Sequence, residues 1–217
     1  MVPVRHWSNR DDVISSLGTW PWREELAQKR KQQTRDLSDL VQGSVRANTF
    51  RGFAGLQPSR IFRPWAIQTF SGTALAELLG IQRQTDYDEW IERLAASLEK
   101  RWKDEAPEKI KCGPKYKLVN LLLKTLCESR IIPDDEWQKL VWLIHVPLDR
   151  YVLLSVRSCG QQFSTYASIG PIPRNPSMNF IKKSEEYRAF QQGIRELADR
   201  ADVPPITLDY VAWNDVH

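Results

Sequence analysis

The chain has 217 residues, 41% of them hydrophobic, which is enough for one domain or two small lobes with a sizeable core. Its 31 basic and 27 acidic side chains leave a net charge of only +4, but residues 1–130 hold 22 basic and 16 acidic residues, so the basic excess lies entirely there. Such a local field attracts polyanions, of which nucleic acid is the commonest in a cell. A solvated helical surface is the equally weighted alternative.

Several classes of protein are disfavoured by what the sequence lacks. No stretch approaches 18 uninterrupted apolar residues, and the start, MVPVRHWSNRDD, has no apolar signal region, so we expect a cytoplasmic protein without a membrane partner. The three cysteines show no CxxC spacing, which is typical of a reducing compartment. The Walker, HExxH and GxSxG patterns are also absent, and we expect neither a metal nor a cofactor.

Helical periodicity dominates the first half of the chain. The sequence predicts one surface helix over residues 21–43, followed over residues 44–70 by an irregular connector with exposed basic groups. A short helix closed by Gly80 comes next. Residues 86–102 place Trp90, Leu94, Leu98 and Trp102 at intervals of four, which predicts an amphipathic helix.

The second half is also predicted to be helical, apart from a loop rich in glycine, proline and serine. In chain order we expect an apolar helix after Gly113, a helix capped by Asp134 or Asp135, another after residue 149, the loop at 159–177, a helix within 178–201 and a short final helix. The fold class is therefore mainly α. We expect a single unit with approximate lobes at 1–80, 81–160 and 161–217, and a monomer.

The stretch GPKYKLVNLLLK, residues 113–124, places Lys117 at the mouth of the apolar helix. A lysine there most often extends its ammonium into water. A Gly-Pro turn before the helix, however, would leave first-turn N–H groups free to bind a phosphate. Apolar packing and the neighbouring cations Lys111 and Lys115 would disfavour the charged form of Lys117, and a neutral lysine is a nucleophile.

Asp149 follows Lys117 by 32 residues, in the proline-led turn of HVPLDRYVL. The start of an apolar helix would hold its carboxylate charged. A simple helix N-cap is the alternative interpretation.

Together, GPKYKLVN and VPLDRYV resemble the core of the helix-hairpin-helix DNA glycosylases, in particular the 8-oxoguanine glycosylases. That family has a hairpin of glycine, apolar residue, glycine, small residue and lysine, and later a valine-proline-apolar-aspartate turn. Gly113, Lys117, Val146, Pro147 and Asp149 match it. The second hairpin glycine is replaced by Lys115, which either supplies a charge for a DNA phosphate or removes the phosphate site.

The resemblance implies a fold of two small helical lobes around a cleft and a double-stranded DNA partner. It implies Lys117 as nucleophile and Asp149 as catalytic carboxylate in excision of a damaged or modified base, with or without strand cleavage. The expected DNA contacts are Gly113, Lys111, Lys115 and Lys124, although Lys124 could instead pair with an acid. The expected base pocket draws on Asn120, Trp142, His145, Asp209 and Trp213, with core packing of Trp213 and helix capping by His145 as alternatives.

Lys117, Asn120 and Lys124 also occupy places that recur in a similar group of bacterial proteins. A glycosylase that removes glucosylated hydroxymethylcytosine from phage DNA is a further candidate relative, so base excision repair and phage defence are both open roles. Two rival hypotheses remain. One is a non-catalytic helix-hairpin-helix DNA-binding protein, and the other is a helical adaptor or toxin-like protein whose basic clusters meet another protein.

Overall fold

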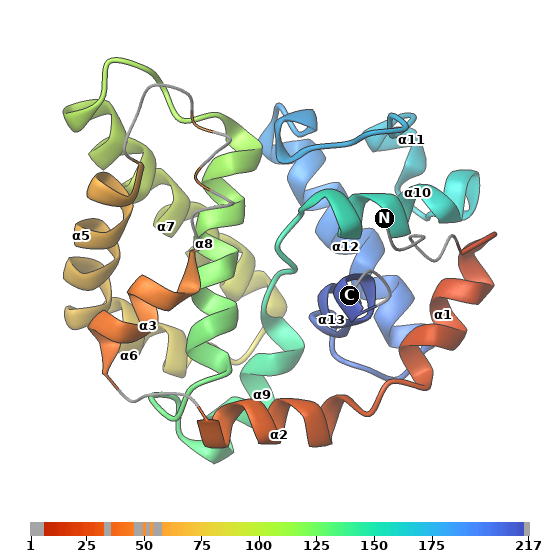
Figure 1. Ribbon diagram of the computed structural model, residues 1–217, viewed down its shortest axis with the longest axis horizontal. Helices are drawn as coiled ribbons and strands as arrows, with labels where there is room; N and C mark the ends of the chain where they lie inside the picture. The colour runs from red at the N-terminus through yellow and green to blue at the C-terminus, as the bar shows by residue number, and fades with distance from the viewer. Residues whose placement is uncertain (1–6, 33–35, 46–49, 51–52, 54–57, 215–217) are drawn as a thin grey trace. The chain divides into compact units, whose positions relative to one another are not determined.

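The computed structural model of the chain describes residues 7–32, 36–45, 50, 53 and 58–214, and all regular secondary structure within them is helical (Figure 1). The mainly α fold class is therefore confirmed. Among these residues, no helix combines the length and the apolar content that a bilayer crossing requires.

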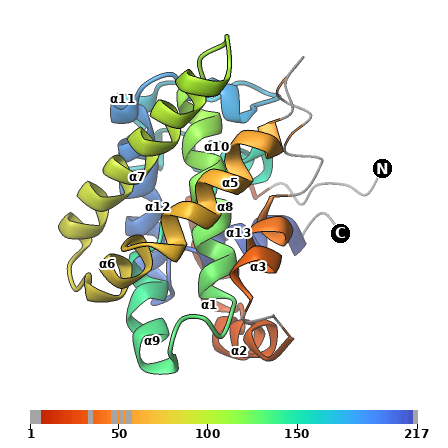
Figure 2. The ribbon, with the colours of Figure 1, turned by 90° about the vertical axis from the view of Figure 1, so that its left-hand side faces the viewer.

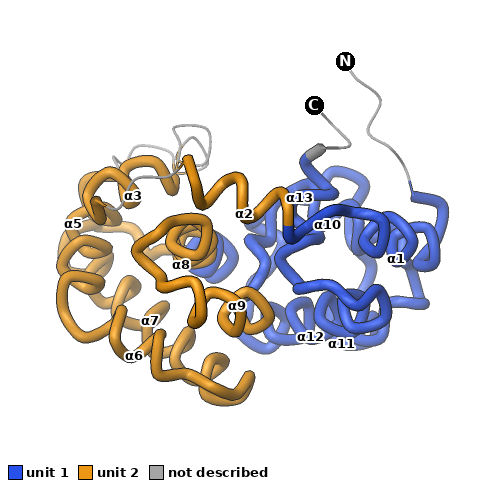
Figure 3. The backbone as a smooth tube through the Cα atoms, turned by 90° about the horizontal axis from the view of Figure 1, so that it is seen from below, with its two compact units in different colours: residues 1–23, 112–117, 145–217 blue, residues 24–111, 118–144 orange. Residues whose placement is uncertain are grey.

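The chain packs into two compact units, each made of segments that are separate in the sequence (Figure 3). Unit 1 contains residues 1–23, 112–117 and 145–217, and unit 2 contains residues 24–111 and 118–144. The division crosses helix α8, Cys112–Cys127, directly after Lys117. Contiguous lobes such as 1–80, 81–160 and 161–217 do not follow these boundaries.

The longest helix of unit 2 is α7, Gln84–Glu105, which lies to one side of α8 (Figure 2). Its predicted apolar stripe is buried from Trp90 to Trp102. Helix α5 packs against both α7 and α3. The helices of this unit are α2 (Trp22–Gln32), α3 (Leu37–Ser44), α5 (Pro58–Ser71), α6 (Ala74–Gly80), α7, the later turns of α8, and α9 (Asp134–Leu143).

Two predictions for unit 2 were wrong. The single helix expected over residues 21–43 is two helices, because the Asp36 carboxylate accepts the N–H of Asp39 at 3.0 Å and starts α3 there. The connector expected over residues 44–70 contains α5 from Pro58 onward, which includes Pro64 and buries an apolar face. Residues 33–35, 46–49, 51–52 and 54–57 lie outside the described part of the chain.

One of the basic residues within the basic part of the chain, residues 1–130, is a core residue. Arg30 is 5% exposed, and its guanidinium donates to the carbonyls of Cys127, Ser129 and Ile132 and to the Asp134 carboxylate. A cation at the end of α8 compensates carbonyls that have no helical partner. Asp134 or Asp135 was expected to cap α9, but Pro133 holds the cap position, and the Asp134 carboxylate pairs with Arg30.

Unit 1 packs helices α1, α10, α12 and α13 against one another. A Cβ on Gly193 of α12 would lie 2.3 Å from the Phe163 ring, so glycine is required for this close approach. The loop predicted over residues 159–177 contains two short helical turns. The helices of the unit are α1 (Arg10–Gly18), the first turns of α8, α10 (Arg150–Cys159), α11 (Tyr166–Ile169), α12 (Ser184–Arg200) and α13 (Thr207–Asn214), with 3-10 turns at Gly160–Gln162 and Met178–Phe180.

Candidate functional site

Lys117 lies in the second turn of α8, half-buried, with the residues before it already helical. The helix begins at Cys112, so Gly113 and Pro114 form its first turn instead of a preceding turn as predicted. Lys111 occupies the cap position, and its side chain makes no capping hydrogen bond. The first turn of α8 therefore has cations near it and no acidic residue, which favours a negatively charged ligand there.

Gly113 is buried, and its N–H donates to the carbonyl of Ile181 at 3.2 Å. A Cβ at this position would lie 1.8 Å from the carbonyl oxygen of Met178. Gly113 was an expected DNA contact and first-turn N–H groups were expected to be free, but the chain itself already binds the Gly113 N–H, and Pro114 has no N–H. The glycine is needed because the segment around Met178 packs against the start of the helix.

Tyr116, which no sequence motif indicated as a site residue, fixes the same stretch of α8 to helix α12. Its ring stacks on Tyr187 with centroids 3.7 Å apart and planes at 9°, and its hydroxyl donates to Ser184 Oγ at 3.0 Å. Lys117, the next residue, is therefore carried by a rigidly packed segment. An aromatic residue between two lysines was the one available signal, and it does not identify a partner 71 positions away.

Asp149 is the N-cap of α10, as one of its two interpretations predicted. Oδ1 accepts the backbone N–H groups of Tyr151 at 2.8 Å and Val152 at 3.0 Å. Oδ2 accepts the indole N–H of Trp213, from α13, at 2.7 Å. The residue is 5% exposed, so these three donors replace most of the water that would otherwise solvate the carboxylate.

Two further charged groups act on this carboxylate. Burial raises the pKa of Asp149 above its usual range, and the charge of Asp209 raises it further. The ammonium of Lys117 lowers the same pKa, as do the hydrogen bonds from Val152 and Trp213. The predicted nucleophile and the predicted carboxylate thus lie within electrostatic reach of each other, in one unit, with Asp209 as a second acid.

The other base-pocket candidates do not all join this cluster. His145 is buried, with Nδ1 2.7 Å from the Tyr187 hydroxyl and Nε2 3.0 Å from Arg195 Nη1. Since arginine can only donate, the Nδ1 atom carries the imidazole proton in this arrangement. His145 therefore links α12 to the VPLD turn. Asn120, fully buried on α8, and Trp142, half-buried on α9, belong to unit 2.

The predicted DNA-contacting lysines differ in what surrounds them. Lys111 is exposed. Lys115 is half-buried, with Nζ 5.1 Å from the centre of the Tyr116 ring. Lys124 pairs with Glu128 at 3.8 Å, which is the alternative that the sequence left open for it. Lys111 and Lys115 are therefore the cations placed at the start of α8.

Two of the three thiols are poor alternative nucleophiles. Burial raises the pKa of Cys127 and of Cys159 to about 12, so both are protonated at neutral pH. Cys112, the first residue of α8, is partly exposed. Within the described part of the chain, no cluster of three histidine, cysteine or acidic side chains could hold a metal ion.

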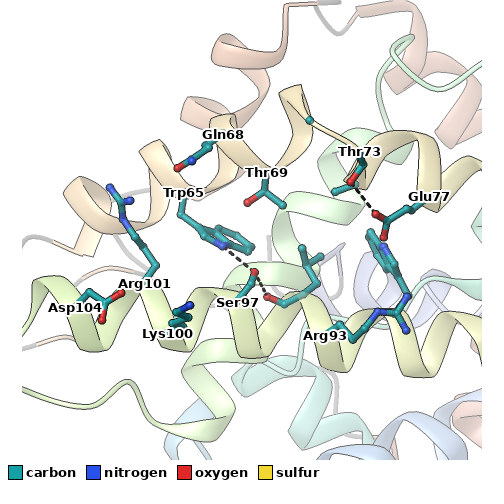
Figure 4. Close-up of a pocket in the computed structure, with 14 residues that line it drawn as sticks. Trp65, Gln68, Thr69, Thr73, Glu77, Arg93, Ser97, Lys100, Arg101 and Asp104 are labelled. Carbon is teal, nitrogen blue, oxygen red and sulfur yellow. Dashed lines mark hydrogen bonds between the residues drawn. The ribbon is translucent and has the colours of Figure 1, made fainter.

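Unit 2 has an open pocket of about 540 Å³ between α5, α6 and α7 (Figure 4). Its floor includes Trp65, whose indole N–H donates to Ser97 Oγ at 3.0 Å. Along α7, Arg93, Lys100 and Arg101 supply positive charge, while Glu77 and Asp104 supply negative charge. None of the site residues predicted from the sequence lines this pocket.

Comparison of the chain with models of protein families, with curated proteins and with solved structures finds no match. The functional interpretation is therefore carried by the chemistry of the residues themselves. Lys117, Asp149, Asp209 and Trp213 form the group with the clearest capacity for chemistry, because a primary amine and a second buried carboxylate both act electrostatically on Asp149.

Proposed function

We propose that the chain is a helix-hairpin-helix DNA glycosylase that excises a damaged or modified base, with Lys117 as nucleophile and Asp149 as catalytic carboxylate. One observation carries the proposal. Two residues 32 positions apart, selected from separate motifs, lie in one unit, where the charge of Lys117 acts on the buried carboxylate of Asp149. This electrostatic contact joins the half-buried Lys117 to a carboxylate that is 5% exposed.

The chemistry needs both groups beside one deoxyribose. The neutral amine of Lys117 forms a bond to C1′ while the glycosidic bond breaks, and the base leaves with the bonding electron pair and takes up a proton. Positive charge develops on the sugar in this step, and the ionised carboxylate of Asp149 stabilises it. Loss of a proton from the attached nitrogen and opening of the sugar ring give an iminium, which either hydrolyses or proceeds to strand cleavage by β-elimination.

The proposed hairpin is the pair of consecutive helices α7 and α8 with their connection at residues 106–111. Lys111 and Lys115 are the proposed contacts to a DNA phosphate. Their charges would attract the phosphate, since the Gly113 N–H already donates to Ile181 and cannot bind it. Asp209 and Trp213 are the proposed wall of the base pocket, since both interact with Asp149. The roles of Asn120 and Trp142 in the base pocket and of Lys124 in DNA contact stay predictions.

The test is base release from a panel of DNA duplexes that carry 8-oxoguanine, uracil, an alkylated base or glucosylated hydroxymethylcytosine. Borohydride trapping runs in parallel, because it captures the iminium as a covalent adduct. We expect release from at least one duplex and an adduct that disappears in Lys117→Ala. Release without an adduct would remove the covalent role of Lys117, and absence of release from every duplex would contradict the proposal.

A non-catalytic DNA-binding protein is the second candidate, and one observation favours it. Asp149 has its carboxylate engaged by three donors, as a purely structural cap would. On that hypothesis Lys111, Lys115 and Lys117 contact phosphates. The chain would then bind all duplexes of the panel with similar affinity, lose affinity steeply with added salt, and release no base.

A further inference from the structure

Trp213 stands out among the described large apolar side chains because it is 39% exposed while the α13 residues before it are buried. Its ring packs edge-on against Tyr151, with centroids 4.8 Å apart and planes at 69°. Its indole N–H points to Asp149 Oδ2 at 2.7 Å. An exposed tryptophan thus has its polar edge directed inward, onto the carboxylate that caps α10.

We propose that Trp213 is a positioning residue, which holds the Asp149 carboxylate in its ionised form and in one orientation for base excision. This inference rests on the proposed function. The two N–H groups of Tyr151 and Val152 anchor Oδ1 only, and rotation about the bond to the carboxyl group would leave Oδ2 undefined. The bond from Trp213 supplies the second anchor, so both oxygens have fixed positions.

The chemistry of an indole makes this bond selective for the charged carboxylate. Trp213 Nε1 donates a hydrogen bond and cannot accept one. A proton on Oδ2 would make that oxygen a much weaker acceptor for the indole N–H, whereas the ionised oxygen accepts a charge-assisted hydrogen bond. Asp149 needs such support, because burial and the nearby Asp209 both favour its neutral form. Tyr151 keeps the ring in place from the side.

Trp213→Phe is the test variant, since it keeps an aromatic ring against Tyr151 and removes only the N–H donor and part of the ring. Trp20→Phe is the matched control. Trp20 is also in unit 1, and its buried indole nitrogen has no hydrogen-bond partner among the described residues. Thermal melting of both variants establishes that each is folded before any rate is compared.

The first readout is the pH profile of single-turnover base release. We expect its acidic limb to move to higher pH in Trp213→Phe and to stay in place in Trp20→Phe. Below the wild-type midpoint, the rate of Trp213→Phe should fall by about tenfold or more, the change expected when a hydrogen bond to a charged group is lost. A uniform loss of rate at every pH would indicate that Trp213 acts only through packing or through the base pocket, and would overturn the inference.

The second readout does not depend on activity. The carboxyl carbon of Asp149 is followed by NMR in protein labelled at aspartate, with Asp149→Asn for assignment. Its titration should move to higher pH in Trp213→Phe. An unchanged titration overturns the role of Trp213 even if the wild type excises bases. If the titration shifts but the protein releases no base from any duplex, the effect of the hydrogen bond on Asp149 is supported and the glycosylase function is contradicted.

Discussion

Helices α8 and α10 in unit 1 begin in opposite ways. Helix α10 starts on Asp149, whose own carboxylate satisfies two of its first N–H groups. Helix α8 starts without a side-chain cap, follows Lys111 and has no acid in its first turn. A capped start is complete within the chain, whereas the start of α8, with the Gly113 N–H already bonded, attracts an anion from outside through its lysines and the helix dipole. The two starts together place a fixed carboxylate and an amine in one unit.

The largest effect is expected from a substitution that keeps the positive charge of Lys117 near Asp149 and removes its nucleophilic amine. Lys117→Arg retains a cation near Asp149, but a guanidinium stays protonated and cannot attack C1′. We expect base release to fall by about 1,000-fold or more while DNA affinity stays within about threefold of the wild type. Quantified release and a binding titration measure the two effects. A trapped adduct in Lys117→Arg would show that another residue is the nucleophile.

Two substitutions of Asp149 separate its charge from its capping role. Asparagine also caps helices well, so Asp149→Asn should keep the two bonds from Tyr151 and Val152, lose the one from Trp213, and slow base release by about 100-fold or more. Asp149→Ala should slow release to a similar extent and also cost about 1–2 kcal/mol of unfolding free energy. Denaturant titration gives the stabilities. Full activity in Asp149→Asn would reduce Asp149 to a cap.

Substitution of Gly113 tests the packing that holds the start of α8. The added methyl of Gly113→Ala would lie 1.8 Å from the Met178 carbonyl oxygen, so the backbone must move, at a cost of about 3 kcal/mol. Gly80→Ala is the control, because a Cβ there meets nothing within 4 Å. We expect the control to unfold at the wild-type temperature or slightly above it. Equal stability of both variants would contradict the close approach to Met178.

The smallest expected effect is a pH dependence of stability. Since the folded-state pKa of Asp149 is raised, the folded protein binds a proton more tightly than the unfolded chain does. This contribution to stability is fully present below the ordinary carboxyl pKa near 3.8 and is lost as the pH rises through the folded-state value. Asp149→Asn should lack this loss, so the unfolding free energy of the variant should rise relative to that of the wild type from pH 4 to pH 7. Parallel profiles for the two proteins would show that Asp149 does not titrate abnormally.

Local patterns predicted the elements well where one helix buries one apolar face. The stripe from Trp90 to Trp102 became α7, Gly80 ends α6, and the turn before Asp149 starts α10. The failures came where a nearby polar group or tertiary contact decides the boundary. Asp36 interrupts the helix predicted over residues 21–43. Helix α5 forms in a stretch rich in helix-breaking residues, because its apolar side chains are buried in unit 2.

By itself, the sequence determined that the chain is mainly helical, that an apolar helix carries Lys117 and that a proline-led turn presents Asp149. These properties follow from spacing and caps within a few residues, which the order of the amino acids contains directly. Only the tertiary structure decided that Trp213 would donate a hydrogen bond to Asp149, 64 positions earlier, and that the Gly113 N–H would donate to the carbonyl of Ile181. Such pairings depend on how whole helices pack, and no local pattern records them.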